Sequence, residues 1–344
     1  MTDLKILGLD PSDDDLVAGA FAVLHDSHAA DSPESPAPHR EAFAKELAHP
    51  RPDQDQTVFA AVDGDTVAGV LWVEFPNRGN LHFGGAHLHV HPDHRRRGIG
   101  TALLEHFIAF SREHGRTDIV LDTHMRWEDG VERPEAGRRF LGKHGFEQAL
   151  TLINRRCAVD ALDPAAEQEL LDKAQAAAGD EYEIISWIGR TPEELLETMA
   201  RIDSTVLAEV PLGDLDLEPE TVDVELKNAR ADRNEAVGVY PVQTVARHRG
   251  SGEVVANTVV FSHKYPDHHD AFQGITIVDK DHRGHRLGLL LKLVNLRLLR
   301  ENFPHVKAIW TDNADVNAPM IGINVDLGYE IVDGAAEFQL KLDK

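Results

Sequence analysis

Two short segments rich in arginine and glycine could hold a phosphate group. Arg95–Gly100 and Arg283–Gly288 each follow a strand-like run and open a helix-like run. Backbone N–H groups at a helix start, assisted by the helix dipole, bind phosphate or pyrophosphate, and glycine lets a ligand approach the main chain closely. The alternative is a solvated charge run beside a plain loop. Neither segment has the Gly-Lys-Ser/Thr of a Walker loop, and both follow several strands, unlike a dinucleotide-binding fingerprint.

The two segments belong to a longer internal repeat. Val90–Gly100 corresponds to Val278–Gly288 at a constant offset of 188 residues, since 278 − 90 = 188. The offset falls to 183 at Gly145 and Gly328, which is a loop-sized change. This pattern predicts a duplicated domain.

The elements around the two segments are predicted in the same order. Hydrophobic periodicity and turn residues indicate, in each copy, a hairpin, a third strand, the segment, a helix, a strand, a helix and further strand. In the first copy these cover residues 57–62, 66–75, 86–90, 99–114, 118–123, 135–143 and 146–156. In the second they cover 239–247, 254–262, 275–278, 287–299, 307–311, 319–327, 330–332 and 336–342. The leucine-rich helix at 287–299 should be nearly surrounded by protein.

A predicted linking helix at about 164–178 divides the chain into domains 1–160 and 161–344. Residues 32–38, which contain three prolines, are predicted to form a surface loop, either a connector or a lid.

Composition limits the classes of partner. The formal net charge of −24 argues against nucleic acid or an anionic membrane. It would suit a cationic amine, although an acidic surface can also serve solubility alone. No apolar run reaches membrane-spanning length and no secretory signal is visible, so with a single cysteine, Cys157, we expect a cytoplasmic protein. No metal site is expected, although His268-His269-Asp270 leaves that alternative beside a polar loop.

The segment Arg95–Gly100 matches the Gln/Arg-x-x-Gly-x-Gly/Ala motif of the GNAT superfamily of acyl-CoA-dependent N-acyltransferases, which this chain resembles. The preceding run 88–92 and the later stretch 140–146, ending in Gly-Phe, resemble the family's strand and following helix. The asparagine-rich segments 313–320 and 324–329 resemble tandem acetyltransferases, the group that includes mycothiol synthase.

The resemblance implies an α/β fold of two tandem domains, each a mixed, mostly antiparallel central sheet flanked by helices. It also implies transfer of an acetyl or short acyl group from coenzyme A to the amine of a small molecule, by direct attack in a ternary complex. The alternative is an acyl-CoA sensor with degenerate sites. A monomer or a homodimer is expected. By the resemblance, acetyl-CoA or another acyl-CoA would contact Leu88, Val90, Arg95, Arg96, Arg97, Gly98, Ile99, Gly100, Thr101, Ile277, Val278, Arg283, Gly284, His285, Arg286, Leu287, Gly288, Asn313 and Asn317.

The sequence departs from the family in two places. Arg286 stands where the first copy has Gly98, so the second cradle is expected to survive if this position has an ordinary φ. The tyrosine that many members place four residues before the Gly-Phe glycine is replaced by Leu141 and Asn324. Asn324 could still donate a hydrogen bond to the thiolate, or it could be a plain polar residue.

The general base is left open among several residues. His87 and His89 lie on the strand beside the expected thioester, and imidazole can accept an ammonium proton. They could equally be paired structural histidines. Glu74 is a further candidate, whereas Gln273 and Thr276 of the second copy cannot act as bases.

Overall fold

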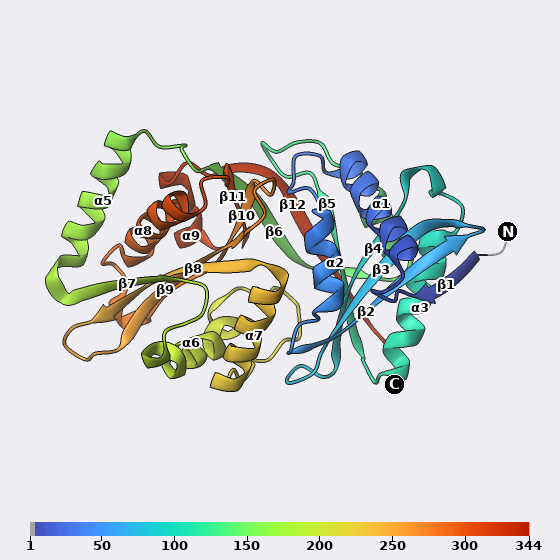
Figure 1. Cartoon of the computed structure of the whole chain (residues 1–344), viewed down its shortest axis with the longest axis horizontal. Helices are drawn as coiled ribbons and strands as arrows, with labels where there is room; N and C mark the ends of the chain where they lie inside the picture. The colour runs from blue at the N-terminus through green and yellow to red at the C-terminus, as the bar shows by residue number, and fades with distance from the viewer. Residues whose placement is uncertain (1–3, 344) are drawn as a thin grey trace. The chain divides into compact units, whose positions relative to one another are not determined.

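The chain forms two compact units (Figure 1), and the computed structural model describes residues 4–343. Unit 1 contains the chain up to Leu152 together with 212–221 and 333–343, and unit 2 contains 153–211 and 222–332. Neither unit is therefore one continuous half of the sequence. The single boundary expected near residue 160 differs from this division, because residues 212–221 and 333–343 belong to the first unit.

Unit 1 is a mixed sheet with helices on both faces (Figure 1). Its strands run in the order β1-β2-β3-β4-β5-β12, and every neighbouring pair is antiparallel except the parallel pair β4–β5. The strands are β1 (Leu4–Gly8), β2 (Gln54–Asp63), β3 (Thr66–Pro76), β4 (Phe83–Val90), β5 (Asp118–Met125) and β12 (Glu330–Lys341), and the helices are α1 (Asp14–Asp31), α2 (Arg40–Ala48), α3 (Ile99–Glu113) and α4 (Ala136–Lys143). A further strand, β6 (Glu147–Ala158), runs from unit 1 into unit 2.

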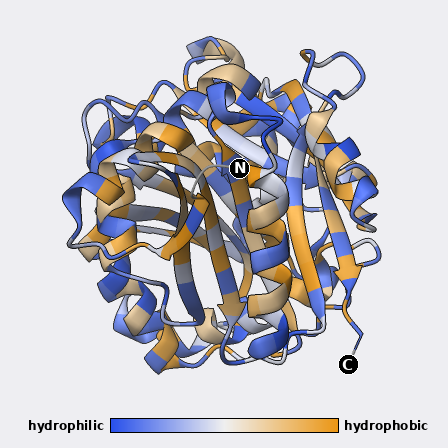
Figure 2. Cartoon of the chain, turned by 90° about the vertical axis from the view of Figure 1, so that its right-hand side faces the viewer, coloured by the Kyte–Doolittle hydropathy of each residue, from blue (hydrophilic) through white to orange (hydrophobic). Residues whose placement is uncertain are grey.

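Side chains on the two faces of the unit 1 sheet pack differently, because polar and apolar residues alternate along its strands (Figure 2). Leu103 and Phe107 of α3 are fully buried against one face, which includes Leu71 and Ala86. The other face packs against α1 and α2 through a smaller cluster that includes Val70. The polar residues of β4 and β5 alternate with the α3-facing ones and so share the face of α1 and α2.

Unit 2 repeats this arrangement. Its strands run in the order β11-β10-β9-β8-β7, with β10–β11 parallel and the other pairs antiparallel. The strands are β7 (Tyr182–Ile188), β8 (Val239–His248), β9 (Val254–His263), β10 (Asp270–Val278) and β11 (Ala308–Ala314), and the helices are α5 (Pro164–Ala178), α6 (Leu196–Glu209), α7 (Val224–Val237), α8 (Leu287–Asn302) and α9 (Ala318–Asp326). In Figure 1, α5 and α8 cover one face of the sheet, and α6 and α7 cover the other.

The leucine-rich helix is buried as its sequence predicts. Leu291, Leu293 and Leu299 of α8 are fully buried, and the helix packs on β8, β9 and α5. Even the polar residues Lys292 and Asn295 on this helix are inaccessible to solvent. Each needs an internal polar partner, because an unpaired buried polar group costs about 1–3 kcal/mol.

Several elements lie outside the sequence predictions. The strands β1 and β7 and the helices α1, α2, α6 and α7 were not predicted, and the two runs expected at 330–332 and 336–342 form the single strand β12. The linking helix is α5, with bounds that match the prediction. None of the helices in residues 4–343 has an apolar stretch long enough to span a bilayer.

Candidate active site

The two Arg/Gly turns have left-handed residues at the same two aligned positions. In the first turn Arg96 has φ 63° and Gly98 has φ 88°, and in the second turn Gly284 has φ 88° and Arg286 has φ 54°. Since 284 − 96 and 286 − 98 are both 188, glycine and arginine have exchanged places between the copies. The expectation that Arg286 needs an ordinary φ is wrong, because the second turn keeps the same pattern with a positive φ there.

Each turn leads directly into a helix, so its N–H groups lie at a helix start. Gly98 precedes α3 and Arg286 precedes α8, and neither helix has a side-chain cap at this end. A Cβ added at Gly98 or Gly284 would meet nothing within 4 Å. Uncapped donors beside open space fit a bound anion such as the pyrophosphate of an acyl-CoA.

The first arginine of each turn joins the preceding strand to a helix of the same unit. Arg95 Nε donates to the Val90 carbonyl at 3.0 Å, and its other nitrogens bind Asp31 of α1 at 2.8 and 2.6 Å. Arg283 Nε likewise donates to the Val278 carbonyl at 3.1 Å, and its guanidinium binds Glu209 of α6 at 2.9 Å. Both side chains are occupied within their own unit. The exposed Arg96 and Arg97 have no acidic partner within residues 4–343, so they are the better placed to meet a phosphate.

The parallel strand pair next to each turn separates before it ends. Pairing of β4 with β5 covers Phe83–Ala86 and Asp118–Leu121, although the strands continue to Val90 and Met125. Pairing of β10 with β11 covers Asp270–Phe272 and Ala308–Trp310. Leu88–Val90 and Thr276–Val278 therefore lie beyond the paired part of these strands, and their contact with pantetheine stays a prediction. The Val90 carbonyl is already bound by Arg95 and Ser27, and the Val278 carbonyl by Arg283, so neither is among the available groups.

In unit 1 an imidazole–carboxylate pair lies beside this gap. His87 Nδ1 donates to Asp122 Oδ1 at 2.7 Å, from β4 to β5, and both side chains are partly exposed, at 55% and 40%. The hydrogen bond to Asp122 raises the pKa of His87 to about 9, with burial acting in the opposite direction. Burial favours the neutral acid at Asp122, but the hydrogen bond from His87 prevails and lowers the pKa of Asp122 to about 2.

His89, two residues along β4, has the opposite electrostatic environment. Burial, together with the positive charge of His87, lowers the pKa of His89 to about 4. Its ring makes no hydrogen bond within the part of the chain that the structure describes. His89 is therefore neutral at pH 7 and a weaker base than His87.

Two carboxylates extend the polar face of unit 1. Glu74 Oε1 accepts from Gln56 Nε2 at 2.7 Å and from Trp72 Nε1 at 3.1 Å, so it is held beside His87. Its negative charge also contributes to the raised pKa of His87. His124 Nδ1, on β5, donates to the fully buried Asp333 at 2.9 Å.

The predicted loop at 32–38 is tied to the same cluster. Arg133 is nearly inaccessible, donates to Asp333 from Nε at 2.5 Å and binds Glu34 of the loop at 2.6 Å. His28 of α1 donates to the Ser35 carbonyl at 2.9 Å. The loop is thus fastened at two points in unit 1.

Asn324 is part of a closed interior network in unit 2. Its side chain is completely buried, Oδ1 accepts from Lys292 Nζ at 2.7 Å, and Nδ2 donates to Asn313 at 2.6 Å. Burial lowers the pKa of Lys292 to about 7. The amides of Asn324 and Asn313 are thus engaged with each other, and that of Asn324 has no access to solvent. Asn317 caps α9 without a side-chain hydrogen bond.

Leu141 and the cluster at His268–Asp270, which the sequence also singled out, have structural surroundings. Leu141 is buried in the unit 1 core. His268 and His269 donate to the backbone carbonyls of Asp270 and His305, which favours the structural interpretation of that cluster. Residues 4–343 contain no cluster of three or more His, Cys, Asp or Glu side chains arranged to hold a metal ion.

Sequence reasoning missed Asp122, His124 and Asp333. Asp122 and His124 alternate along a strand, as His87 and His89 do, and this repeated spacing of two could have indicated a shared polar face. Asp333 could not have been found, because it reaches unit 1 from the opposite end of the sequence.

In both units the strands follow the same order, the parallel strand pair separates, and an Arg/Gly turn leads into a helix; a tandem GNAT fold has this arrangement. Residues 22–133 match the acetyltransferase (GNAT) family model. A tandem GNAT protein from the clavulanic acid biosynthesis pathway is 25% identical, with a TM-score of 0.83 over 99% of both chains. Residues 22–133 thus resemble the GNAT acetyltransferase family, the chain as a whole has the fold of a tandem GNAT protein, and the predicted fold class is confirmed.

Other solved structures show the same fold at lower identity. A GCN5-related N-acetyltransferase from Sphaerobacter thermophilus has a TM-score of 0.67 and 14% identity over 100% of this chain and 98% of its own. A glucosamine N-acetyltransferase region of a fungal β-N-acetylglucosaminidase has a TM-score of 0.66 and 15% identity, with 99% of this chain matching 38% of that one. No significantly similar sequence is found among curated proteins.

Proposed function

We propose that this protein is an N-acetyltransferase that moves an acetyl or short acyl group from coenzyme A to a small amine, and that unit 1 carries the reaction. The observation that supports unit 1 is the His87–Asp122 pair beside the strand gap. Unit 2 has Ile275 at the position of His87, since 275 − 87 = 188. An alkyl side chain there can neither accept nor donate a proton.

The residues of unit 1 suit a donor with a pyrophosphate and a long arm. The N–H groups of the turn before α3 would hold the phosphates, with Arg96 and Arg97 nearby as exposed cations. The unpaired main-chain groups around Leu88 would line the arm and the thioester. When bound, acetyl-CoA supplies a thioester carbon that an amine can attack directly.

The polar face of unit 1 suits a cationic acceptor. Glu74 and Asp122 lie on this face with His87, so two carboxylates accompany one imidazolium. A pKa of about 9 makes His87 a stronger base than an ordinary histidine, and it is matched to the ammonium group that it must deprotonate. Leu141 cannot protonate the leaving thiolate, so solvent supplies that proton in this proposal.

The test is release of free thiol from acetyl-CoA in the presence of a panel of small amines. We expect amine-dependent thiol release from the whole chain and at least a tenfold loss in His87→Gln. Tight acetyl-CoA binding without thiol release for any amine would instead favour an acyl-CoA sensor.

A further inference from the structure

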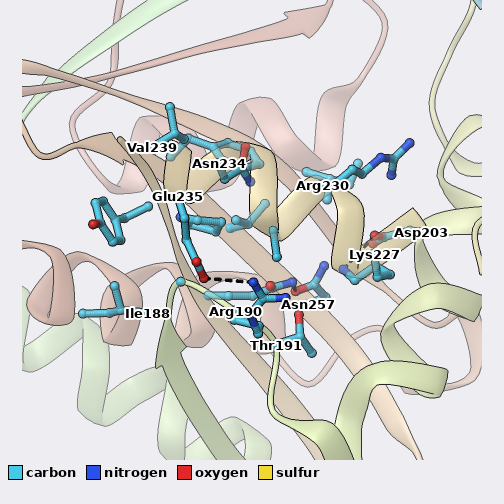
Figure 3. Close-up of a pocket in the computed structure, with 18 residues that line it drawn as sticks. Ile188, Arg190, Thr191, Asp203, Lys227, Arg230, Asn234, Glu235, Val239 and Asn257 are labelled. Atoms are coloured by element: carbon cyan, nitrogen blue, oxygen red, sulfur yellow. Dashed lines mark hydrogen bonds and ion pairs between the residues drawn. The ribbon is translucent and has the colours of Figure 1, made fainter. Parts of the chain in front are cut away.

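Unit 2 contains a pocket that the proposed transfer does not use. It has a volume of about 580 Å³ and lies between α7 and the sheet, on the face of α6 and α7 (Figure 3). This volume is within the range of roughly 300–1,000 Å³ that is usual for small-molecule sites. The pocket therefore has room for a ligand.

The floor of the pocket holds two buried amide side chains. Gln243 of β8 and Asn257 of β9 are only 6% and 1% exposed, and Gln243 Nε2 donates to Asn257 Oδ1 at 2.8 Å. The Gln243 carbonyl and the Asn257 amino group make no hydrogen bond within residues 4–343. If both side-chain amides are turned over, so that oxygen and nitrogen exchange places, one acceptor and one donor are still left without a partner in the protein. The floor is thus complementary to a ligand group that both donates and accepts a hydrogen bond.

The charged side chains at the rim of the pocket are already engaged with partners in the protein. Lys227 binds Asp203 at 2.9 Å, and Arg190 binds Glu235 at 3.1 Å and Asp232 at 2.6 Å. Figure 3 marks the Arg190–Glu235 contact with a dashed line. Arg230, also at the rim, has an interaction partner of its own. A charged ligand would have to break one of these pairs or stay uncompensated, which disfavours both anions and cations.

The remaining floor is apolar and unreactive. Val259, Phe261 and Ile275 line it from β9 and β10. Ile275 occupies the position at which unit 1 has His87, so this floor carries no acid or base for acyl transfer. The site is built to hold an apolar body without transforming it.

From these features we infer that the unit 2 pocket binds an uncharged small molecule that carries a secondary amide on an apolar body. The amide carbonyl accepts from Asn257 and the amide N–H donates to the Gln243 carbonyl. Val259, Phe261 and Ile275 contact the apolar body. Acylation of an amine produces an amide of this kind, but the binding site stands independently of the proposed function, since it requires no acyl donor.

The test is calorimetric titration of the full chain, without acetyl-CoA, with three probes that share one apolar body. N-benzylacetamide carries the amide, benzylamine carries a cation and benzoate carries an anion. We expect N-benzylacetamide to bind with one site per chain, and at least tenfold more tightly than either charged probe. No binding of the amide would overturn the assignment, and so would equal or tighter binding of a charged probe that the Ala231→Trp variant loses.

Variants locate the site. We expect Asn257→Leu to weaken N-benzylacetamide binding about tenfold. Ala231→Trp, which projects a bulky side chain from α7 into the pocket, should abolish binding without changing the buried floor. Ala177→Trp, on an exposed position of α5, is the matched control and should bind normally. Unchanged binding in a folded Ala231→Trp variant would place the probe elsewhere and contradict the proposal.

Discussion

At the residue scale, His87 and Asp122 set the pH at which unit 1 can accept a proton. His87 is a base only when neutral, and its pKa of about 9 keeps it protonated at pH 7. We expect kcat/KM to rise with pH up to about 9. In Asp122→Asn the pKa of His87 should return toward the ordinary value of about 6.5. The pH range over which kcat/KM rises, the acid limb of its pH profile, should move to lower pH by the same amount. The profile is measured with an aromatic amine whose own pKa lies below 6, so that the amine does not titrate and His87 accepts the proton that its nitrogen releases on attack. An unmoved limb would remove His87 from the role of base.

The left-handed residues of the turns give a second prediction at this scale. A non-glycine residue with positive φ is strained by about 1–2 kcal/mol, partly offset by the larger chain entropy that glycine loses on folding. We expect Arg286→Gly to raise the free energy of unfolding by roughly 0.5 kcal/mol. Gly98→Ala should lower it by about 1 kcal/mol. Denaturant titration checks both values, and a destabilised Arg286→Gly would refute the reasoning.

At the element scale, Arg133 connects the loop at 32–38 with β12. Asp333 and Arg133 are both almost inaccessible, whereas Glu34 is 46% exposed. Removing the cation deprives the buried Asp333 carboxylate of its guanidinium, so Arg133→Gln should cost about 3 kcal/mol of unfolding free energy. Glu34→Gln should cost less than about 1 kcal/mol, because its ion pair is partly exposed. Similar losses in the two variants would show that Arg133 does not anchor the interior.

The elements that sequence could predict are those with a strong local pattern. The hairpins, the leucine-rich α8 and the linking helix α5 follow from periodicity and turn residues. By contrast, α1 and α7 have weakly segregated faces, so their bounds depend on packing against the sheet rather than on pattern. The phosphate turn was visible because glycine spacing is local. The partners of its arginine, Asp31 and Glu209, were not, because they are distant in sequence.

At the scale of the whole molecule, the last strand of the chain belongs to the first unit. Gly334–Lys341 of β12 pair with Asp118–Met125 of β5. A chain truncated after Val332 should therefore lose the protection of β5 from hydrogen exchange, although the cut lies more than 200 residues away. A contiguous fragment 1–160, cut at the boundary suggested by sequence, should lack this strand and fail to fold cooperatively. Normal protection of β5 in the truncated chain would contradict the division into units.

The central claim is that unit 1 holds the acyl donor and carries out the transfer. Gly98 and Gly284 offer a matched pair, since each has φ 88° and open space around an added Cβ. A glutamate at either position places a negative charge in one cradle. The deciding measurement is amine-dependent thiol release from acetyl-CoA by the two variants. The account predicts at least a tenfold loss in Gly98→Glu and near-normal release in Gly284→Glu. Full activity in Gly98→Glu with loss in Gly284→Glu would contradict it.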